Sequence, residues 1–267
     1  MNKTITWARG QKLHYIVEGE GPVLVLLHGF CEDASIFNMQ IEELSKTNKL
    51  IIPDLPGHGS SSVIRQVTLS QMAAAVKAML DAENIRQCII CGHSMGGYVT
   101  LAFAQLFPNV LQGFGLLFST SIADTEEKKE NRLKSYSFVE EHGTPDFAKT
   151  LIPTLFAPDF EDKELIENTT ESACNTPKAG VMAATLAMRS RPDLTEVLKK
   201  SSVPVLITAG KKDKVIIYKD IQKIANQIKD CTFETFEKSA HMGMIEEPEK
   251  MNEVLQNFIS HCNNLSV

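Results

Sequence analysis

The sequence contains no apolar run of 18 residues, no block of lysine and arginine, and no apolar signal-peptide core in its first ten residues. The absence of a long apolar run argues against a transmembrane helix, and the absence of an apolar signal-peptide core argues against a secretory signal. The absence of a lysine and arginine block, together with a net charge of −6, argues against nucleic acid as a partner. We therefore expect a soluble cytoplasmic protein without a membrane or nucleic-acid partner, either a monomer or a homodimer.

Clustered cysteine is also missing. The six cysteines are scattered, and only Cys88 and Cys91 show a Cys-x-x-Cys spacing. That pair lies inside an apolar strand-like run, and no second pair or nearby Cys/His pair completes a metal site. In a cytosolic chain of this length we expect free thiols that fill the core. The sequence predicts neither a metal nor an organic cofactor.

The 267 residues suffice for one large domain with a full core, or for one domain with an insertion. Short β-type apolar runs alternate with segments of helical spacing, and this alternation predicts an α/β fold with a mostly parallel sheet flanked by helices on both faces. The expected strands lie at residues 4–8, 14–17, 23–27, 50–52, 85–90, 111–118, 203–209 and 232–236, and the expected helices at 69–82, 98–107 and 248–259.

The β-type runs stop between residues 119 and 193. This segment is helical in pattern, rich in acidic side chains and interrupted by five prolines. We predict a helical cap at 120–193, inserted into an α/β core formed by 1–119 and 194–267; the alternative is a set of ordinary peripheral helices. Two apolar pieces of the cap, 155–157 and 181–188, would face the active site or form the cap's own core.

The segment from Cys88 to Gly97 carries the main chemical signal. An apolar run there breaks into Gly92-His93-Ser94-Met95-Gly96, and helix-compatible residues follow. A strand that turns sharply into a helix at Gly-x-Ser-x-Gly holds the serine in a strained conformation with its hydroxyl exposed. A side chain at Gly92 or Gly96 would collide with the neighbouring turn. Ser94 is therefore the candidate nucleophile; the alternative is a glycine-rich turn that happens to contain serine.

A serine hydroxyl needs a general base, and the base needs an orienting carboxylate. His241 lies between the last expected strand and the last helix, and Asp213 directly follows the strand at 203–209. Both positions belong to the same carboxyl edge of the sheet as Ser94, where open α/β sheets bind ligands. The chain order Ser, Asp, His also fits an α/β-hydrolase arrangement. Considered singly, His241 could be a surface histidine and Asp213 a turn cap.

Acyl transfer also needs donors for the oxyanion. The backbone N–H of Met95 opens the helix after the nucleophile, where the positive end of the helix dipole lies. A second N–H is expected from the turn after the strand at 23–27, and Phe30 is the candidate because Gly29 lets the chain fold back. We expect His28 and His93 to brace the two turns rather than act as bases.

These motifs together resemble the α/β-hydrolase fold superfamily over nearly the whole chain. The resemblance rests on His28-Gly29-Phe30, Pro53-Asp54-Leu55-Pro56-Gly57-His58-Gly59, Gly92-His93-Ser94-Met95-Gly96-Gly97, Gly210-Lys211-Lys212-Asp213 and Ala240-His241. It implies a Ser94, Asp213 and His241 triad with the oxyanion amides assigned above. The segment 189–193, Arg-Ser-Arg-Pro-Asp, is similar to small carboxylesterases and enol-lactonases.

Some branches of that superfamily fit less well. Haloalkane dehalogenases and epoxide hydrolases use an aspartate where this chain has Ser94. Interfacial lipases usually have an apolar lid, whereas this cap is acidic. Cofactor-free haloperoxidases tend to have Trp-Pro after His-Gly, where Phe30-Cys31 stands here.

The expected function is hydrolysis of a small carboxylic ester, thioester or lactone through an acyl-enzyme on Ser94. Two alternatives stay open. One is a carbon–carbon bond hydrolase or lyase with the same triad, in which Arg132, Arg189 or Arg191 either binds a substrate carboxylate or forms surface salt bridges. The other is a ligand-binding or signalling protein with slow turnover.

Overall fold

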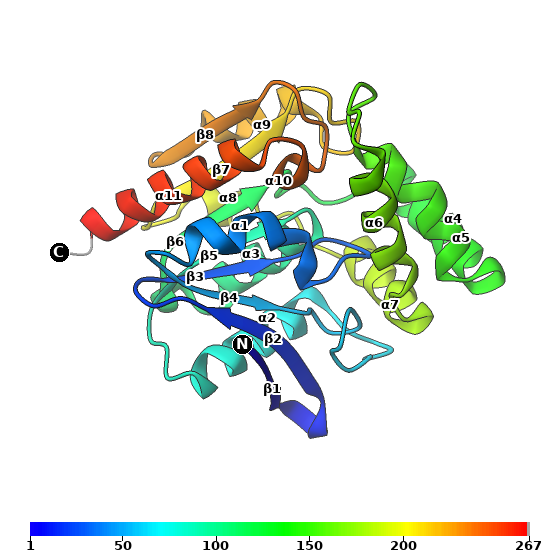
Figure 1. Cartoon of the computed structure of the whole chain (residues 1–267), viewed down its shortest axis with the longest axis horizontal. Helices are drawn as coiled ribbons and strands as arrows, with labels where there is room; N and C mark the ends of the chain where they lie inside the picture. Colours follow the sequence, from blue (N-terminus) through cyan, green and yellow to red (C-terminus); the bar gives the residue numbers. More distant parts are fainter. Residues whose placement is uncertain (266–267) are drawn as a thin grey trace.

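Eight strands form one sheet in the computed structural model, which describes residues 1–265. The order across the sheet is β1-β2-β4-β3-β5-β6-β7-β8 (Figure 1). The strands β1 and β2 pair antiparallel at one edge, β2 pairs antiparallel with β4, and all other pairs are parallel. Their bounds are β1 Asn2–Thr6, β2 Lys12–Glu18, β3 Val23–Leu27, β4 Lys49–Pro53, β5 Cys88–His93, β6 Leu111–Leu117, β7 Val205–Gly210 and β8 Cys231–Phe236.

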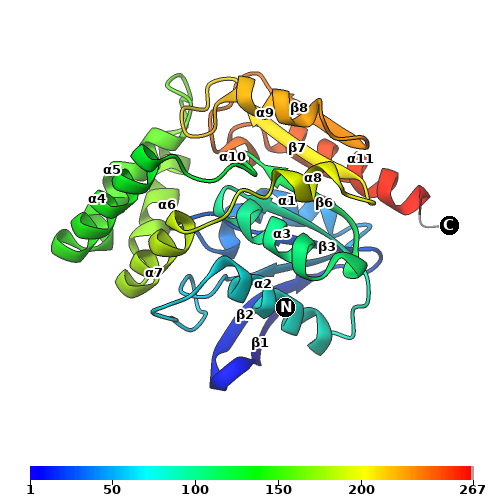
Figure 2. The same ribbon diagram turned by 180° about the vertical axis from the view of Figure 1, so that it is seen from behind.

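Helices cover both faces of this sheet, which confirms the predicted α/β class (Figures 1 and 2). One face packs against α2 (Leu69–Ala82), α3 (Met95–Leu106), α8 (Thr195–Lys199) and α9 (Tyr218–Ala225). The other packs against α1 (Asn38–Leu44), α10 (Gly243–Glu246) and α11 (Pro248–Asn264). Short 3-10 helices lie at η1 Ala8–Gly10, η2 Ala34–Phe37, η3 Pro108–Val110 and η4 Ile152–Leu155.

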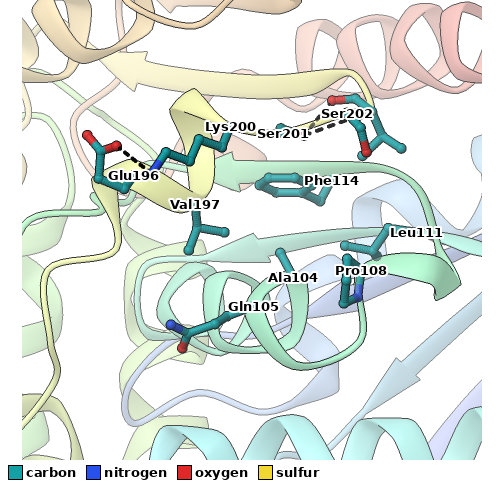
Figure 3. A pocket seen from close by; sticks show the side chains of 11 residues that line it. Ala104, Gln105, Pro108, Leu111, Phe114, Glu196, Val197, Lys200, Ser201 and Ser202 are labelled. Carbon is teal, nitrogen blue, oxygen red and sulfur yellow. Dashed lines mark hydrogen bonds and ion pairs between the residues drawn. The ribbon is translucent and has the colours of Figure 1, made fainter.

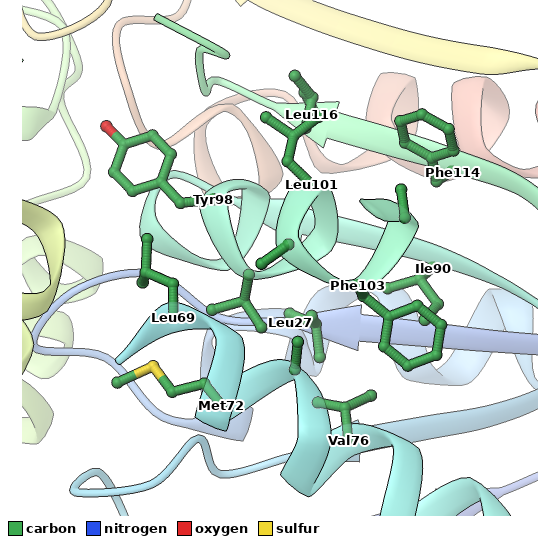
Figure 4. Close-up of a cluster of buried hydrophobic side chains, with 14 of the residues drawn as sticks. Leu27, Leu69, Met72, Val76, Ile90, Tyr98, Leu101, Phe103, Phe114 and Leu116 are labelled. Carbon is green, nitrogen blue, oxygen red and sulfur yellow. The ribbon is translucent and has the colours of Figure 1, made fainter. Parts of the chain in front are cut away.

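Strand β5 shows how the sheet separates the two cores. Its side chains alternate, so Ile90 belongs to the α2–α3 side while Ile89 and Cys91 belong to the α1–α11 side. The α2–α3 side is filled by large side chains such as Phe103, which is fully buried between these helices and the sheet (Figure 4). Full burial of each such side chain stabilises the fold by about 1.5–3 kcal/mol.

Four α-helices connect β6 to α8, and they lie together beyond one end of the sheet (Figures 1 and 2). They are α4 Glu126–His142, α5 Thr144–Leu151, α6 Lys163–Cys174 and α7 Lys178–Arg189. The chain enters and leaves this segment at adjacent points, because Leu194 N–H donates to the Ser121 carbonyl (2.9 Å) and the hydroxyls of Ser121 and Thr195 are 2.8 Å apart.

Some predicted boundaries were wrong by a few residues. The strand expected at 203–209 begins at Val205, because Pro204 lacks the N–H that a ladder needs. The helix expected from Tyr98 begins at Met95, directly after Ser94. Cys88 and Cys91 are free and buried, as predicted. Within residues 1–265, no helix has both the length and the apolar character to cross a membrane.

Candidate active site

Ser94 occupies a tight corner between β5 and α3. Its backbone has φ 48° and ψ −111°, a left-handed φ that is strained for a residue with a side chain. The corner is possible because two glycines allow close packing of the backbone. A Cβ on Gly92 would lie 2.2 Å from the carbonyl of Gly96, and a Cβ on Gly96 would lie 2.2 Å from the carbonyl of Leu27. The backbones of β5, α3 and β3 therefore pack closely against one another at this corner, and Ser94 is partly exposed.

The structure brings Ser94, His241 and Asp213 into one hydrogen-bonded chain. Nε2 of His241 lies 2.9 Å from Oγ of Ser94, and Nδ1 of His241 lies 2.8 Å from Oδ2 of Asp213. Because a carboxylate only accepts, Nδ1 of His241 carries the proton, and the lone pair of Nε2 faces the serine hydroxyl. This geometry is that of a nucleophile, a general base and an orienting carboxylate.

Asp213 is held in its ionised form. Its Oδ1 accepts the N–H groups of Val215 (2.7 Å) and Ile216 (2.9 Å), while Oδ2 faces His241. Burial by itself would raise the pKa of this carboxyl, but the interaction with His241 and the two backbone donors outweigh burial and lower it below 3.8. A fixed negative charge beside Nδ1 can stabilise an imidazolium on His241.

The two backbone N–H groups predicted to bind an oxyanion belong to Met95 and Phe30. Met95 is the first residue of α3, so its N–H has no intrahelical acceptor. Phe30 follows Gly29 in the turn after β3, and the next residue, Cys31, has φ 58°. Among residues 1–265, neither the Met95 nor the Phe30 N–H donates to a protein acceptor. Such unpaired donors beside a serine are suited to a developing negative charge.

His93 and Glu32 form a buried ion pair behind the serine. Nδ1 of His93 lies 2.9 Å from the Glu32 carboxylate, and Nε2 lies 2.9 Å from the carbonyl of His241. Both partners only accept, so both ring nitrogens donate and the imidazole is protonated. Burial would lower the pKa of His93, but the charge and hydrogen bond of Glu32 raise it above 6.5.

The same carboxylate also accepts a hydrogen bond from the turn that contains Gly29 and Phe30. Glu32 accepts the Gly29 N–H at 2.6 Å, and a Cβ on Gly29 would lie only 2.8 Å from both Glu32 and His93. Burial would raise the pKa of Glu32, but His93 and the Gly29 N–H outweigh it and hold that pKa below 4.5. Glu32 therefore ties the turn before Phe30, through His93, to the backbone of His241.

His28 lies in the same turn as Gly29 and Phe30, and His58 lies in the loop after β4. His28 Nδ1 donates to the Gly29 carbonyl (2.8 Å), and its Nε2 accepts the Leu55 N–H (2.8 Å). His28 thus links the turn of Gly29 and Phe30 to the loop after β4. Burial lowers the pKa of His58 to about 3, so it also stays uncharged.

Ser94 and His241 open into a cavity of about 160 Å³. This volume is below the range of about 300–1,000 Å³ that is usual for ligand pockets, which indicates a small substrate. The lining comes from both the sheet side and the segment between β6 and α8: Phe30, Glu32, Ser94, Tyr98, Arg132, Ser135, Phe147, Leu151, Leu155, Met188, Val215 and His241.

The two apolar pieces of the predicted cap, 155–157 and 181–188, each contribute residues to the cavity wall and to the hydrophobic core. Leu155 and Met188 line the cavity, whereas Phe156 and Val181 are buried in the hydrophobic core. The loop that carries His241 is also attached to this segment. The His241 N–H donates to the Leu155 carbonyl at 2.9 Å, and the Ala157 N–H donates to the Glu246 carboxylate at 2.6 Å.

A larger recess of about 330 Å³ lies elsewhere, between α3, β6 and α8 (Figure 3). It contacts Ala104 and Gln105 at the C-terminal end of α3, whereas Ser94 precedes the N-terminal end of that helix. A 12-residue helix is about 18 Å long, so this recess is separate from the Ser94 cavity.

Sequence reasoning missed two carboxylates near the site. Glu32 is one of two adjacent acidic residues, and nothing local distinguishes it from Asp33. Asp124 lies before α4 with a side chain 1% exposed, between Arg132 and Arg191. Arg191 is buried rather than on the surface. The charged partners His93 of Glu32 and Arg191 of Asp124 are more than 60 positions away in the sequence, so no spacing rule could have found these pairs.

Comparisons with known proteins identify the family of the chain and its similar relatives. A family model described as alpha/beta hydrolase fold matches residues 22–248. The chain is 28% identical to 3-oxoadipate enol-lactonase 1 of Acinetobacter baylyi over 259 residues, 96% of each chain. It is 28% identical over 210 residues to a pimeloyl-[acyl-carrier protein] methyl ester esterase of Nitrosomonas europaea, covering 75% of this chain and 81% of the relative. A malate-bound esterase from Thermogutta terrifontis superposes with a TM-score of 0.93 at 29% identity, over 98% of this chain and 99% of that chain.

Proposed function

The chain belongs to the α/β-hydrolase fold family and is an ester-hydrolysing enzyme, and from this premise we propose that it is a serine hydrolase that forms an acyl-enzyme on Ser94. The substrate class is a small carboxylic ester, thioester or lactone. The observation that carries the proposal is the chain of contacts from Ser94 Oγ to His241 Nε2 (2.9 Å) and from His241 Nδ1 to Asp213 (2.8 Å), at the wall of a cavity.

In the first half-reaction, Ser94 Oγ attacks the carbonyl carbon while its proton moves to Nε2 of His241. The resulting imidazolium is stabilised by Asp213, and the oxyanion accepts the N–H groups of Phe30 and Met95. Collapse of the tetrahedral intermediate breaks the bond to the leaving oxygen or sulfur, which takes the proton from His241. For a lactone the leaving oxygen stays attached to the acyl group.

In the second half-reaction, water replaces the leaving group. His241 Nε2 takes a proton from water as the hydroxide oxygen bonds to the acyl carbon. Collapse of this second intermediate breaks the bond to Ser94 Oγ, which recovers its proton from His241. The products are a carboxylic acid and an alcohol or thiol, or a hydroxy or oxo acid from a lactone, and no metal or organic cofactor takes part.

We also propose that residues 120–193 act as a cap on a core formed by 1–119 and 194–267. The joined entry and exit at Ser121 and Leu194 support this division. So do the cavity residues contributed by the segment, among them Arg132, Phe147 and Met188. The cap then sets the size and polarity of the acyl or leaving group that reaches Ser94.

The test is hydrolysis of p-nitrophenyl esters from acetate to octanoate by wild type, Ser94→Ala and Ser190→Ala. Ser190 is an exposed serine that does not line the cavity and whose hydroxyl bonds to its own helix, so its variant makes the same chemical change outside the cavity wall. We expect a burst of p-nitrophenol with wild type and Ser190→Ala, and a loss of turnover of at least about 10³-fold in Ser94→Ala. The small cavity predicts an optimum among the shorter chains.

Undiminished turnover by Ser94→Ala would refute the acyl-enzyme proposal. An absence of turnover on every ester would instead favour a lactone, a carbon–carbon bond substrate or a slow-turnover binding role. Labelling by a fluorophosphonate, read by mass spectrometry, separates these cases because an activated Ser94 reacts whatever its natural substrate.

A further inference from the structure

We infer that Arg132 forms a carboxylate subsite in the Ser94 cavity, so that the substrate is an ester, thioester or lactone carrying a second, anionic carboxylate group. The inference rests on the proposed function, because it assigns recognition of the compound that Ser94 cleaves. Three observations carry it: the position of Arg132, the local balance of charge, and the hydrogen-bond donors that the guanidinium leaves unused.

Arg132 lies in α4 and lines the same cavity as Ser94 and His241. Among the described residues that line this cavity, it is the only one with a guanidinium or ammonium group. Much of the remaining wall is apolar, with Phe147, Leu155 and Met188 among its members. A permanent cation in such a wall gives a bound anion a fixed place and a partner that is little screened by water.

The charges around Arg132 leave one positive charge uncompensated. Asp124 is the shared partner of Arg132 and Arg191, with its Oδ1 2.7 Å from Arg191 Nη1 and its Oδ2 bonded to Arg132 Nε. Two arginines therefore share a single buried carboxylate. Among the described residues that line the cavity, the one acidic side chain is Glu32, and it is already paired with His93. An incoming carboxylate would complete the balance.

The two arginines differ in their free donors. Arg191 uses its terminal nitrogens on the carbonyls of Met188 (3.1 Å) and Ile122 (3.0 Å), so it is occupied by the fold. Arg132 is anchored to Asp124 through Nε alone. Within residues 1–265, its terminal nitrogens meet only the Met188 sulfur at 3.5 Å, which is a weak acceptor.

This arrangement holds the guanidinium of Arg132 in an orientation suited to bidentate binding of a carboxylate. The Nε contact fixes the plane of the guanidinium, and its terminal N–H groups remain available for two parallel hydrogen bonds. The competing explanation is that Arg132 only ties α4 to Asp124 and to Met188 of α7. A structural tie predicts equal effects of substitution on charged and neutral substrates, whereas a subsite predicts a selective effect.

The experiment compares mono-p-nitrophenyl glutarate with p-nitrophenyl valerate, in which a methyl group replaces the distal carboxylate. Rates are corrected for spontaneous hydrolysis of each ester. Wild type is expected to favour the charged ester by about 10- to 100-fold in kcat/KM, the range for hydrogen bonds to charged groups. Arg132→Gln should abolish this preference mainly through KM, and Arg132→Lys should keep part of it because the charge remains without the fork.

Lys128→Gln is the matched control, since it removes one exposed positive charge from the same helix. It should retain the wild-type preference. Thermal unfolding establishes that each variant is folded. Wild-type hydrolysis of valerate without a preference for the glutarate ester would overturn the inference and leave the proposed function standing. An equal loss on both esters in Arg132→Gln and Arg132→Lys would overturn it as well.

A binding measurement covers the case in which neither ester is turned over, an outcome that counts against ester hydrolysis itself. Monomethyl glutarate should raise the Tm of Ser94→Ala, whereas dimethyl glutarate should raise it less. Adding Arg132→Gln to Ser94→Ala should remove the difference. Equal Tm shifts for the two ligands in Ser94→Ala would refute the carboxylate subsite independently of catalysis.

Discussion

Replacing Glu32 with glutamine should lower the free energy of unfolding by about 3 kcal/mol, because it removes the negative member of a buried ion pair. The side chains of Glu32 and His93 are 2% and 0% exposed. Removing one partner of such a pair costs about 3–5 kcal/mol, since the other charge stays buried without compensation. We expect the lower end, because the Gly29 N–H and His93 both bond to Oε2 of Glu32, and a glutamine carbonyl oxygen in that place can still accept them without the negative charge.

The same substitution should reduce catalysis through position rather than contact with the reacting atoms. Glu32 holds the Gly29 peptide at 2.6 Å, and Gly29 precedes the Phe30 N–H assigned to the oxyanion site. Loss of one oxyanion donor costs about 10²–10³ in kcat, and a displaced donor should cost less. We therefore expect a decrease of about 10- to 100-fold in kcat with little change in KM.

The effect on stability should depend on pH. The pKa of Glu32 is below its ordinary 4.5, so its contribution is present above pH 4.5 and is lost as the pH falls through the folded-state pKa. The pKa of His93 is above its ordinary 6.5, so its contribution is complete below pH 6.5 and is lost as the pH rises through the folded-state value. The stability difference between wild type and Glu32→Gln should be greatest between about pH 4.5 and 6.5.

Denaturant unfolding from pH 4 to 9 measures this difference, with Glu42→Gln as the control. Glu42 is an exposed acidic residue on α1, so its substitution makes the same chemical change outside the site. A difference below about 1 kcal/mol at pH 5.5, or one that grows steadily with rising pH, would refute the buried ion pair. Unchanged kcat would refute the link from Glu32 to the turn of Gly29 and Phe30.

Two further substitutions test the geometry of the site. Asp213→Asn should lower kcat by about 10⁴-fold with a modest change in KM, because the amide favours the wrong tautomer of His241. Ester kinetics measure this decrease. A loss of kcat below tenfold would contradict the orienting role of Asp213. Gly96→Ala should lower the free energy of unfolding by about 3 kcal/mol or more, because its Cβ would lie 2.2 Å from the Leu27 carbonyl. Denaturant unfolding measures this loss, and wild-type stability would show that the corner can relax.

Local patterns predicted most of the sheet. The continuous apolar run at Val23–Leu27 and the helix at Leu69–Ala82 have the predicted bounds. Both signals depend on residues adjacent in the chain. The helices α1 (Asn38–Leu44) and α9 (Tyr218–Ala225) were not predicted, and both are short enough that their packing, rather than a long periodic pattern, decides them.

The prolines between residues 119 and 193 predicted interruptions but not the helices themselves. In the structure, Pro145 lies in the first turn of α5, Pro177 precedes α7 and Pro192 follows it. A proline lacks an N–H and restricts the residue before it, so it marks the ends of helices. It carries no information on how those helices pack against one another or on which side chains reach Ser94.

The sequence by itself determined the α/β class and the grouping of Ser94, Asp213 and His241, because each of the three follows a strand and parallel strands deliver such residues to one edge. Only the tertiary structure decided the partners of Glu32 and Asp124, the lining of the cavity and the free donors of Arg132. Glu32 and His93 are 61 positions apart, and Arg132 and Met188 are 56 apart. Contacts at such separations depend on how loops and helices pack in three dimensions, which no spacing along the chain records.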